Sequence, residues 1–152
     1  MKIKIDLKFI FRSAIAFLSL LGVIFLLLAE GVESQNLKGF PIALTFSLLA
    51  LVSVIASAIL SWVEGLKPLV KTISCAALEI FAIASLFVTL SYLISGSVDG
   101  IAALTTWDSY NTYLRTHITW NIVSAVFFLL SSIGIIISGF FDDKKNWISV
   151  CQ

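Results

Sequence analysis

The sequence predicts an all-α membrane protein: an antiparallel four-helix transmembrane bundle that forms a single domain over residues 1–152. Of these residues, 59% are hydrophobic and only 12% are charged, whereas soluble domains carry about 25% charged residues. A helix rises about 1.5 Å per residue, so about 20 residues cross the ~30 Å hydrocarbon layer. Four apolar blocks are about this long. They cover residues 10–29, 40–63, 69–95 and 118–141.

The first block follows a basic N-terminal segment, whose basic residues are Lys2, Lys4, Lys8 and, in the first turn of the block itself, Arg12. A basic segment before an apolar run is also typical of a secretory signal peptide. This run is rather long for a signal peptide, and residues 27–29 form a poor small-x-small cleavage site. We therefore expect the block to be retained as the first transmembrane helix.

Proline and glycine residues mark the expected ends of the next two helices. Pro41 and Pro68 lie just inside the starts of the second and third blocks, where a missing N–H group is harmless. Gly65 is placed to end the second helix, and Gly96 and Gly100 are placed at the exit of the third. The fourth helix is expected to begin near residue 118.

The distribution of lysine and arginine predicts the orientation. Eight of the ten basic residues lie in the N-terminal segment, at the link between the second and third blocks, or in the C-terminal tail, if Arg12 and Lys71 in the first turns of their blocks are counted with these segments. Only Lys38 and Arg115 lie in the two remaining links. By the positive-inside rule, both termini face the cytoplasm. We expect a multi-pass protein of the plasma membrane, with a bacterial inner membrane as the default and an organelle membrane as the alternative.

The outer segment 97–117 is the one long link between blocks. Apolar residues recur in it at helical spacing, and Thr105-x-x-Asp108 has the form of a capping box. We expect a short amphipathic helix over residues 106–115 that lies on the outer surface or packs across the mouth of the bundle. Its aromatic and acidic side chains are the candidate surface for docking a partner: Trp107, Asp108, Tyr110 and Tyr113.

Small residues at helical spacing predict where the helices approach one another, because close backbone contact drives helix association in lipid. The expected stripes are Ser53/Ser57/Ser61, Ala77/Ala84/Ser91, Ser131/Gly134/Ser138 and Ala16/Ser19/Gly22. Four phenylalanines of the fourth block are then expected to face lipid or a partner. They are Phe127, Phe128, Phe140 and Phe141.

Glu79 is the one ionisable residue well inside a predicted span. A carboxylate at that depth costs at least about 2.5 kcal/mol, so we expect Glu79 to be protonated unless a partner or water stabilises its charge. No basic residue is expected inside a span to neutralise it. Hydroxyl groups at a matching depth could bond to it and complete an intramembrane polar site. They are those of Ser53, Ser57, Ser131 and Ser132.

Three roles for Glu79 stay open. It could join helices through hydrogen bonds, pair with a basic residue of another subunit, or carry a proton or cation as intramembrane carboxylates often do.

The chain has none of the motifs that mark a catalytic or metal site. It lacks a nucleophile elbow, a phosphate-binding glycine loop and a Cys-x-x-Cys pair. His117 is expected to be an interfacial residue, and a lipid-active enzyme would need it to act with Asp99 and Asp108. Cys75 is expected to be a buried core thiol. We therefore expect no enzyme activity, cofactor, metal or nucleic-acid partner.

These observations favour a small non-enzymatic membrane protein that serves a larger membrane complex as an accessory, assembly or protective subunit. Its partners would be the lipid bilayer and a membrane protein or further copies of the chain. The alternative is a small homo-oligomeric channel or a proton- or ion-coupled transporter that uses Glu79. Duplicated halves and helices broken in mid-span, which are common in transporters, are not evident in the sequence.

Overall fold

The computed structural model describes residues 3–30, 40–63, 67–106, 112–140 and 147–150. The helices in these ranges are α1 (Leu7–Glu30), α2 (Phe40–Trp62), α3 (Pro68–Thr106) and α4 (Thr112–Ser138). Each is long and apolar enough to cross a membrane. The predicted multi-pass architecture of four membrane-spanning helices is therefore confirmed, and α1 and α2 match the first two predicted spans to within a few residues.

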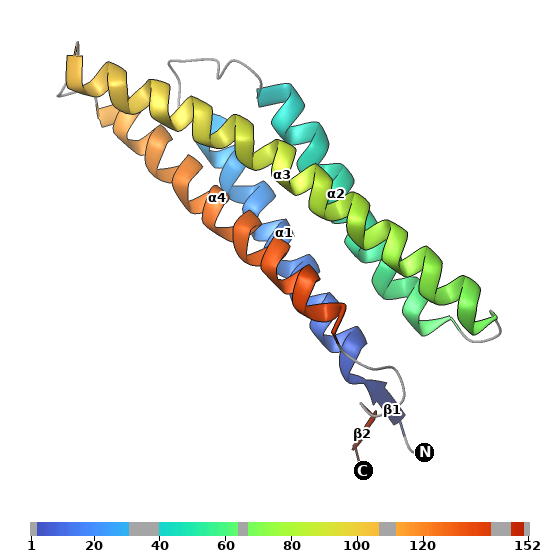
Figure 1. Ribbon diagram of the computed structural model, residues 1–152. Coiled ribbons are helices and arrows are strands. Elements are labelled where there is room, and N and C mark those ends of the chain that lie inside the picture. The colour runs from blue at the N-terminus through green and yellow to red at the C-terminus, as the bar shows by residue number, and fades with distance from the viewer. Residues whose placement is uncertain (1–2, 31–39, 64–66, 107–111, 141–146, 151–152) are drawn as a thin grey trace.

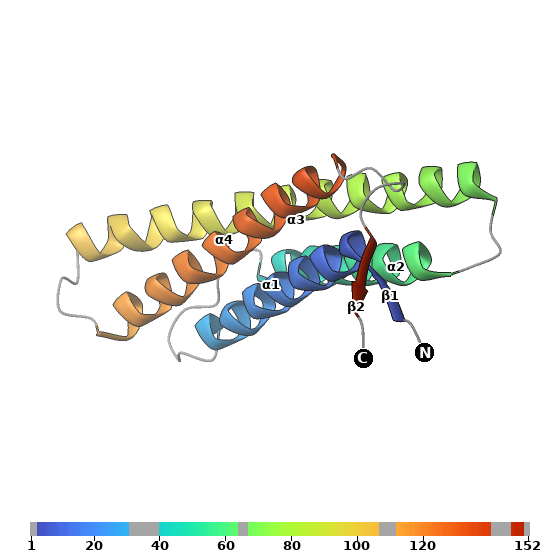
Figure 2. The same cartoon turned by 90° about the horizontal axis from the view of Figure 1, so that it is seen from below.

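The four helices form an elongated bundle in which each runs antiparallel to the next (Figure 1). The most extensive packing joins α1 to α4 and α2 to α3, and the other two sides of the bundle are less closely packed. Figure 2 shows the same bundle from below. We call the end at which α1 and α3 begin the termini end, and the end at which α2 and α4 begin the distal end.

Helix α3 is much longer than the third predicted span. Its 39 residues extend about 58 Å, nearly twice the ~30 Å hydrocarbon layer. The prediction that Gly96 and Gly100 mark its exit is wrong, because the helix continues to Thr106. A glycine costs only about 1 kcal/mol in a helix. Gly100 instead permits close packing, since a Cβ atom there would lie 3.0 Å from the side chain of Ile118 on α4.

The link between α3 and α4 is shorter than the predicted outer segment. Thr106 is the last residue of α3, and Thr112 and Arg115 belong to the first turn of α4. Residues 107–111, the middle of the expected surface helix, lie outside the described residues. A separate helix over residues 106–115 is therefore not shown.

Two short strands, which the sequence analysis did not predict, join the ends of the chain. Strand β1 (Ile3–Asp6) precedes α1, and strand β2 (Trp147–Val150) follows α4. They pair antiparallel, with Ile3 opposite Val150 and Asp6 opposite Trp147. Both termini therefore lie at the same end of the bundle (Figure 1).

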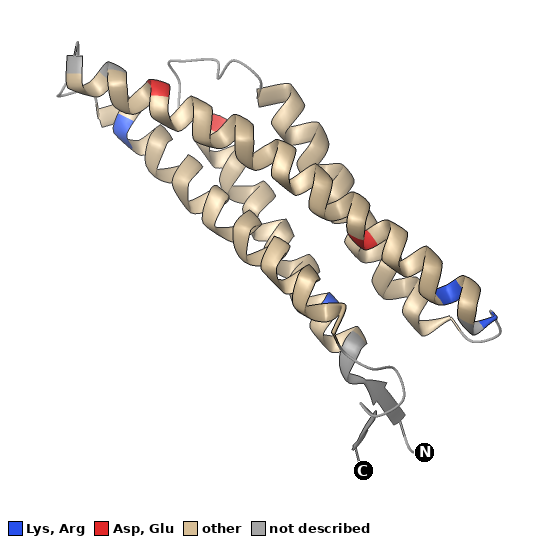
Figure 3. Cartoon of the chain, in the orientation of Figure 1, with Lys and Arg blue, Asp and Glu red and all other residues tan. Residues whose placement is uncertain are grey.

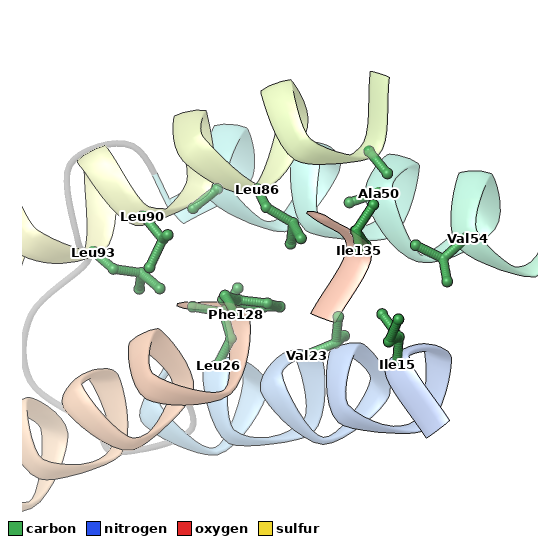
Figure 4. Packing of buried hydrophobic residues seen from close by; sticks show 12 residues of the cluster. Ile15, Val23, Leu26, Ala50, Val54, Leu86, Leu90, Leu93, Phe128 and Ile135 are labelled. Atoms are coloured by element: carbon green, nitrogen blue, oxygen red, sulfur yellow. The ribbon is translucent and has the colours of Figure 1, made fainter. Parts of the chain in front are cut away.

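The core is formed by side chains from all four helices that point toward the bundle axis (Figure 4). Phe128 of α4 is among the largest fully buried side chains and lies close to Leu26 of α1. The prediction that Phe128 faces lipid or a partner is therefore wrong. Phe140 is exposed as predicted, Phe127 is partly buried, and Phe141 lies outside the described residues.

Small residues explain why a ring as large as that of Phe128 fits in the bundle. A Cβ atom at Gly22 of α1 would lie 2.6 Å from the Phe128 ring, so any residue larger than glycine would clash with the ring. The predicted stripe Ala16/Ser19/Gly22 does face the interior, and so does Ser131/Gly134/Ser138. The predicted stripe Ala77/Ala84/Ser91 is exposed, because α3 packs through a different face that includes Ala82, Leu86 and Leu93.

Candidate functional site

Charged residues occupy few positions on the four helices (Figure 3), and one acidic residue, Glu79, is tied to a basic partner. Arg12 of α1 donates a hydrogen bond from Nε to Oε1 of Glu79 on α3 at 2.8 Å. Its Nη2 atom contacts the same carboxylate oxygen. The side chains of Arg12 and Glu79 are 4% and 14% exposed, so the pair is largely buried inside the bundle.

The two remaining helices also reach the Glu79 carboxylate. Ser57 of α2 directs its hydroxyl group at Oε1, at 3.3 Å. The hydroxyl oxygen of Ser138 on α4 lies 3.5 Å from the same oxygen, and its shorter contact, at 2.7 Å, is to the carbonyl oxygen of Ile135 on its own helix. Cys75 lies one turn before Glu79 on α3 and is buried. Its sulfur lies 3.9 Å from Nη1 of Arg12. Every transmembrane helix thus contributes to one polar cluster, which we call the Arg12–Glu79 cluster.

The local sequence explains how the cluster forms. Arg12 precedes Ile15 and Ser19 by three and seven residues, so it lies on the face of α1 that packs inside the bundle. Cys75 and Glu79 are four residues apart and share a face of α3. The long Arg12 side chain can therefore remain inside the bundle and bring its guanidinium group to the carboxylate.

The expectation that no basic residue inside a span neutralises Glu79 is wrong. The sequence analysis assigned Arg12 to the basic N-terminal segment, whereas α1 begins at Leu7 and buries Arg12 to 3% exposure. The missed signal is the helical register that Arg12 shares with the interior stripe of α1. Since the counter-charge comes from the same chain, Glu79 needs no basic residue from another subunit.

Of the four hydroxyl groups expected near Glu79, the structure brings only that of Ser57 to the carboxylate. Ser53, Ser131 and Ser132 are buried, and each bonds to the carbonyl oxygen four residues earlier on its own helix. Such a bond satisfies the hydroxyl group locally. These three serines therefore pack inside the bundle without joining the Arg12–Glu79 cluster. Ser138, which the sequence analysis placed in a packing stripe, takes their place.

The predicted docking loop falls mostly on residues that the structure does not describe. Trp107, Asp108 and Tyr110 lie outside the described residues. Tyr113 lies in the first turn of α4 and is 64% exposed. It is therefore accessible at the distal end of the bundle.

His117 is only 7% exposed, so it is more deeply buried than the interfacial residue that the sequence analysis expected. Its Nδ1 atom lies 2.7 Å from the carbonyl oxygen of Ala29 at the end of α1. A carbonyl oxygen only accepts, so Nδ1 carries the hydrogen and donates. Nε2 then accepts from Nδ2 of Asn121 at 3.2 Å. His117 thus caps one of the last carbonyl groups of α1, which have no partner within the helix.

Of the three residues that a lipid-active enzyme would need at this end, the structure describes His117 and Asp99. Both ring nitrogens of His117 are used by Ala29 and Asn121, and Asp99 is exposed on α3. Asp108 lies outside the described residues. Within the described part of the chain, no three His, Cys, Asp or Glu residues are grouped so that they could hold a metal ion.

Comparison of the chain with protein-family models, with curated proteins and with solved structures finds no match.

Proposed function

We propose that this protein is a small non-enzymatic integral membrane protein that acts as an accessory, assembly or protective subunit of a larger membrane complex. The observation that carries the proposal is the Arg12–Glu79 pair, which balances the intramembrane charge inside one chain. The neighbouring serines satisfy their hydroxyl groups on their own helices. The charge pair thus joins α1 to α3, and these serines are satisfied locally and leave no free hydroxyl beside it.

The exposed surface of the bundle supports a role that depends on contacts with other molecules. Large apolar side chains cover the outer faces of the helices, as a bilayer requires. Helix α3 is also far longer than a bilayer is thick, so it extends beyond the hydrocarbon layer. Together with Tyr113, its distal turns offer a partner a rigid surface at the membrane boundary.

We further propose that both termini face the cytoplasm of a bacterial inner membrane. Eight of the ten basic residues lie in segments that this orientation places on the cytoplasmic side, and two lie in segments on the outer side. The pairing of β1 with β2 agrees with it, because it holds the two termini at one end of the bundle.

The competing function is a small homo-oligomeric channel or a proton-coupled transporter that uses Glu79. The convergence of four helices on this carboxylate favours it. It would require the Arg12–Glu79 pair to open during each cycle, so that the carboxylate exchanges protons or cations.

Site-specific photo-cross-linking in the native membrane, followed by purification in mild detergent, tests the proposal. A photoreactive residue replaces Tyr113, and the matched control replaces Ile59, an exposed residue near the termini end of α2. We expect the position of Tyr113 to cross-link one discrete membrane protein that co-purifies at a fixed ratio, and the position of Ile59 not to do so.

A particle that contains only copies of this chain would contradict the proposal. Proton flux into liposomes that Glu79→Gln abolishes would establish the transporter in its place.

A further inference from the structure

An apolar groove opens between α3 and α4 in the distal half of the bundle. Six residues of α3 between Leu90 and Ile101 and four residues of α4 between Ile122 and Leu129 line a cavity of about 290 Å³. Ser97 supplies the one hydroxyl group among these side chains. The groove follows a side of the bundle at which the helices pack less closely than α1 packs against α4.

The groove is open to the side and not enclosed by the protein. Large apolar residues of both walls are 46–58% exposed, among them Val98, Ile101 and Val126. These walls lie within segments apolar enough to span the membrane. The molecules that meet such a wall in a bilayer are lipid acyl chains.

The level of the membrane boundary near the groove can be placed from neighbouring contacts. His117 of α4 bonds to Ala29, one residue before α1 ends at Glu30. Gly100 of α3 approaches Ile118 at this same level. The groove-lining residues of α4 begin four residues deeper than Ile118, and Arg115 lies three residues farther out. Arg115 is therefore close to the level of the lipid headgroups.

Arg115 also lies on the same face of α4 as the groove. It precedes Ile122 by seven residues, which is about two helical turns, or about 10.5 Å along the axis. Its side chain is exposed, and it has no ion-pair or hydrogen-bond partner among the described side chains. Asp99, the acidic residue of α3 nearest in sequence to the groove walls, follows Leu90 by nine residues. It is therefore on the opposite face of α3.

An arginine above an apolar groove matches the chemistry of a phospholipid. A guanidinium group binds phosphate oxygens through paired N–H donors and holds its charge at all physiological pH values. An acyl chain is apolar and narrow, so it can lie in the apolar groove below the arginine.

We propose that this protein binds one glycerophospholipid at the distal end, with an acyl chain in the α3–α4 groove and the phosphate on Arg115. The site would hold this lipid longer than lipids on the remaining described surface, because a basic side chain here lies above an apolar groove. The proposal is independent of the identity of any protein partner.

Native mass spectrometry of the purified full-length protein, titrated with phosphatidylglycerol in mild detergent, tests the site. We expect one tightly bound phospholipid, and Arg115→Gln should weaken its binding at least tenfold. Ala125→Leu, which fills the groove, should also weaken it. The matched controls are Lys71→Gln, a basic residue at the termini end, and Val52→Leu on the exposed face of α2. Both should bind as the unmodified chain does.

A second probe separates the phosphate contact from the apolar one. Diacylglycerol carries the same acyl chains without a phosphate, so it should bind the unmodified chain at least tenfold more weakly than phosphatidylglycerol does. It should also be insensitive to Arg115→Gln. Equal affinity for the two lipids, or equal loss of lipid in Arg115→Gln and Lys71→Gln, would overturn the proposal. Occupation of the groove by a protein segment in the native membrane, detected by cross-linking from Val126, would overturn it as well.

Discussion

The two ends of the bundle are held together by different interactions. At the termini end, Arg12 and Glu79 join α1 to α3 by charge, and Ser57 and Ser138 add α2 and α4. At the distal end, the neutral ring of His117 bonds α4 to the last turn of α1, and α3 leaves an open groove beside α4. One end therefore depends on four helices that meet at one carboxylate, and the other on pairwise contacts.

This difference matters because charge and packing respond differently to substitution. Removing one member of a buried ion pair leaves the other charge uncompensated, whereas removing a neutral hydrogen bond costs much less. In lipid, packing also gains little from burial of apolar surface, since the surrounding acyl chains are equally apolar. We therefore expect the stability of the bundle to depend most on the termini end.

The largest effect is expected from Glu79→Gln, which leaves the guanidinium group of Arg12 buried without a carboxylate. We expect the free energy of unfolding to fall by about 3–5 kcal/mol, measured by unfolding in mixed detergent micelles. The double variant Arg12→Gln/Glu79→Gln removes both charges and should be more stable than Glu79→Gln alone. A Glu79→Gln protein as stable as the unmodified chain would indicate that Glu79 is protonated and joins the helices without charge.

Close packing in the middle of the bundle should give the next largest effect. Gly22→Ala places a methyl group about where the Phe128 ring lies, so the ring or the helix must shift. We expect a loss of about 1–3 kcal/mol in the same unfolding measurement. The combination Gly22→Ala/Phe128→Leu should recover part of that loss, because leucine is smaller than phenylalanine. No recovery would show that the cost arises from the backbone of α1.

A smaller and local effect is expected at the distal end from His117→Ala. The variant frees the carbonyl group of Ala29, at a cost of about 1–3 kcal/mol for a buried group left without a partner. Hydrogen exchange should increase in the last turn of α1 and stay unchanged near Arg12. A uniform increase along α1 would contradict the separation of the two ends.

The smallest effects should distinguish serines that bond within their own helix from Ser57, which bonds to another helix. Ser131→Ala and Ser132→Ala remove hydroxyl groups that bond to their own helix, so we expect changes of about 0.6 kcal/mol or less. Ser57→Ala removes a donor to the Glu79 carboxylate and should cost more. Equal losses for the three variants in unfolding measurements would show that Ser57 adds little to the charge pair.

Much of the helix arrangement could be predicted because hydrophobicity is a local property. The first two spans agree closely with α1 and α2, and the buried faces at Ser19 and Ser131 were found from the spacing of small residues. The end of α3 could not be predicted. Gly100 has the same local signature whether it ends a helix or lets two helices approach, and only its contact with Ile118 distinguishes the two.

The candidate site shows the same limit of prediction from sequence even more clearly. The sequence by itself determined that Glu79 lies in a span and that a charge there needs a partner, since the cost of a carboxylate in lipid does not depend on the fold. Only the tertiary structure decided that the partner is Arg12, 67 residues earlier in the chain. Helical periodicity places a side chain on a face of its own helix, but which helices face one another depends on how all the side chains pack together.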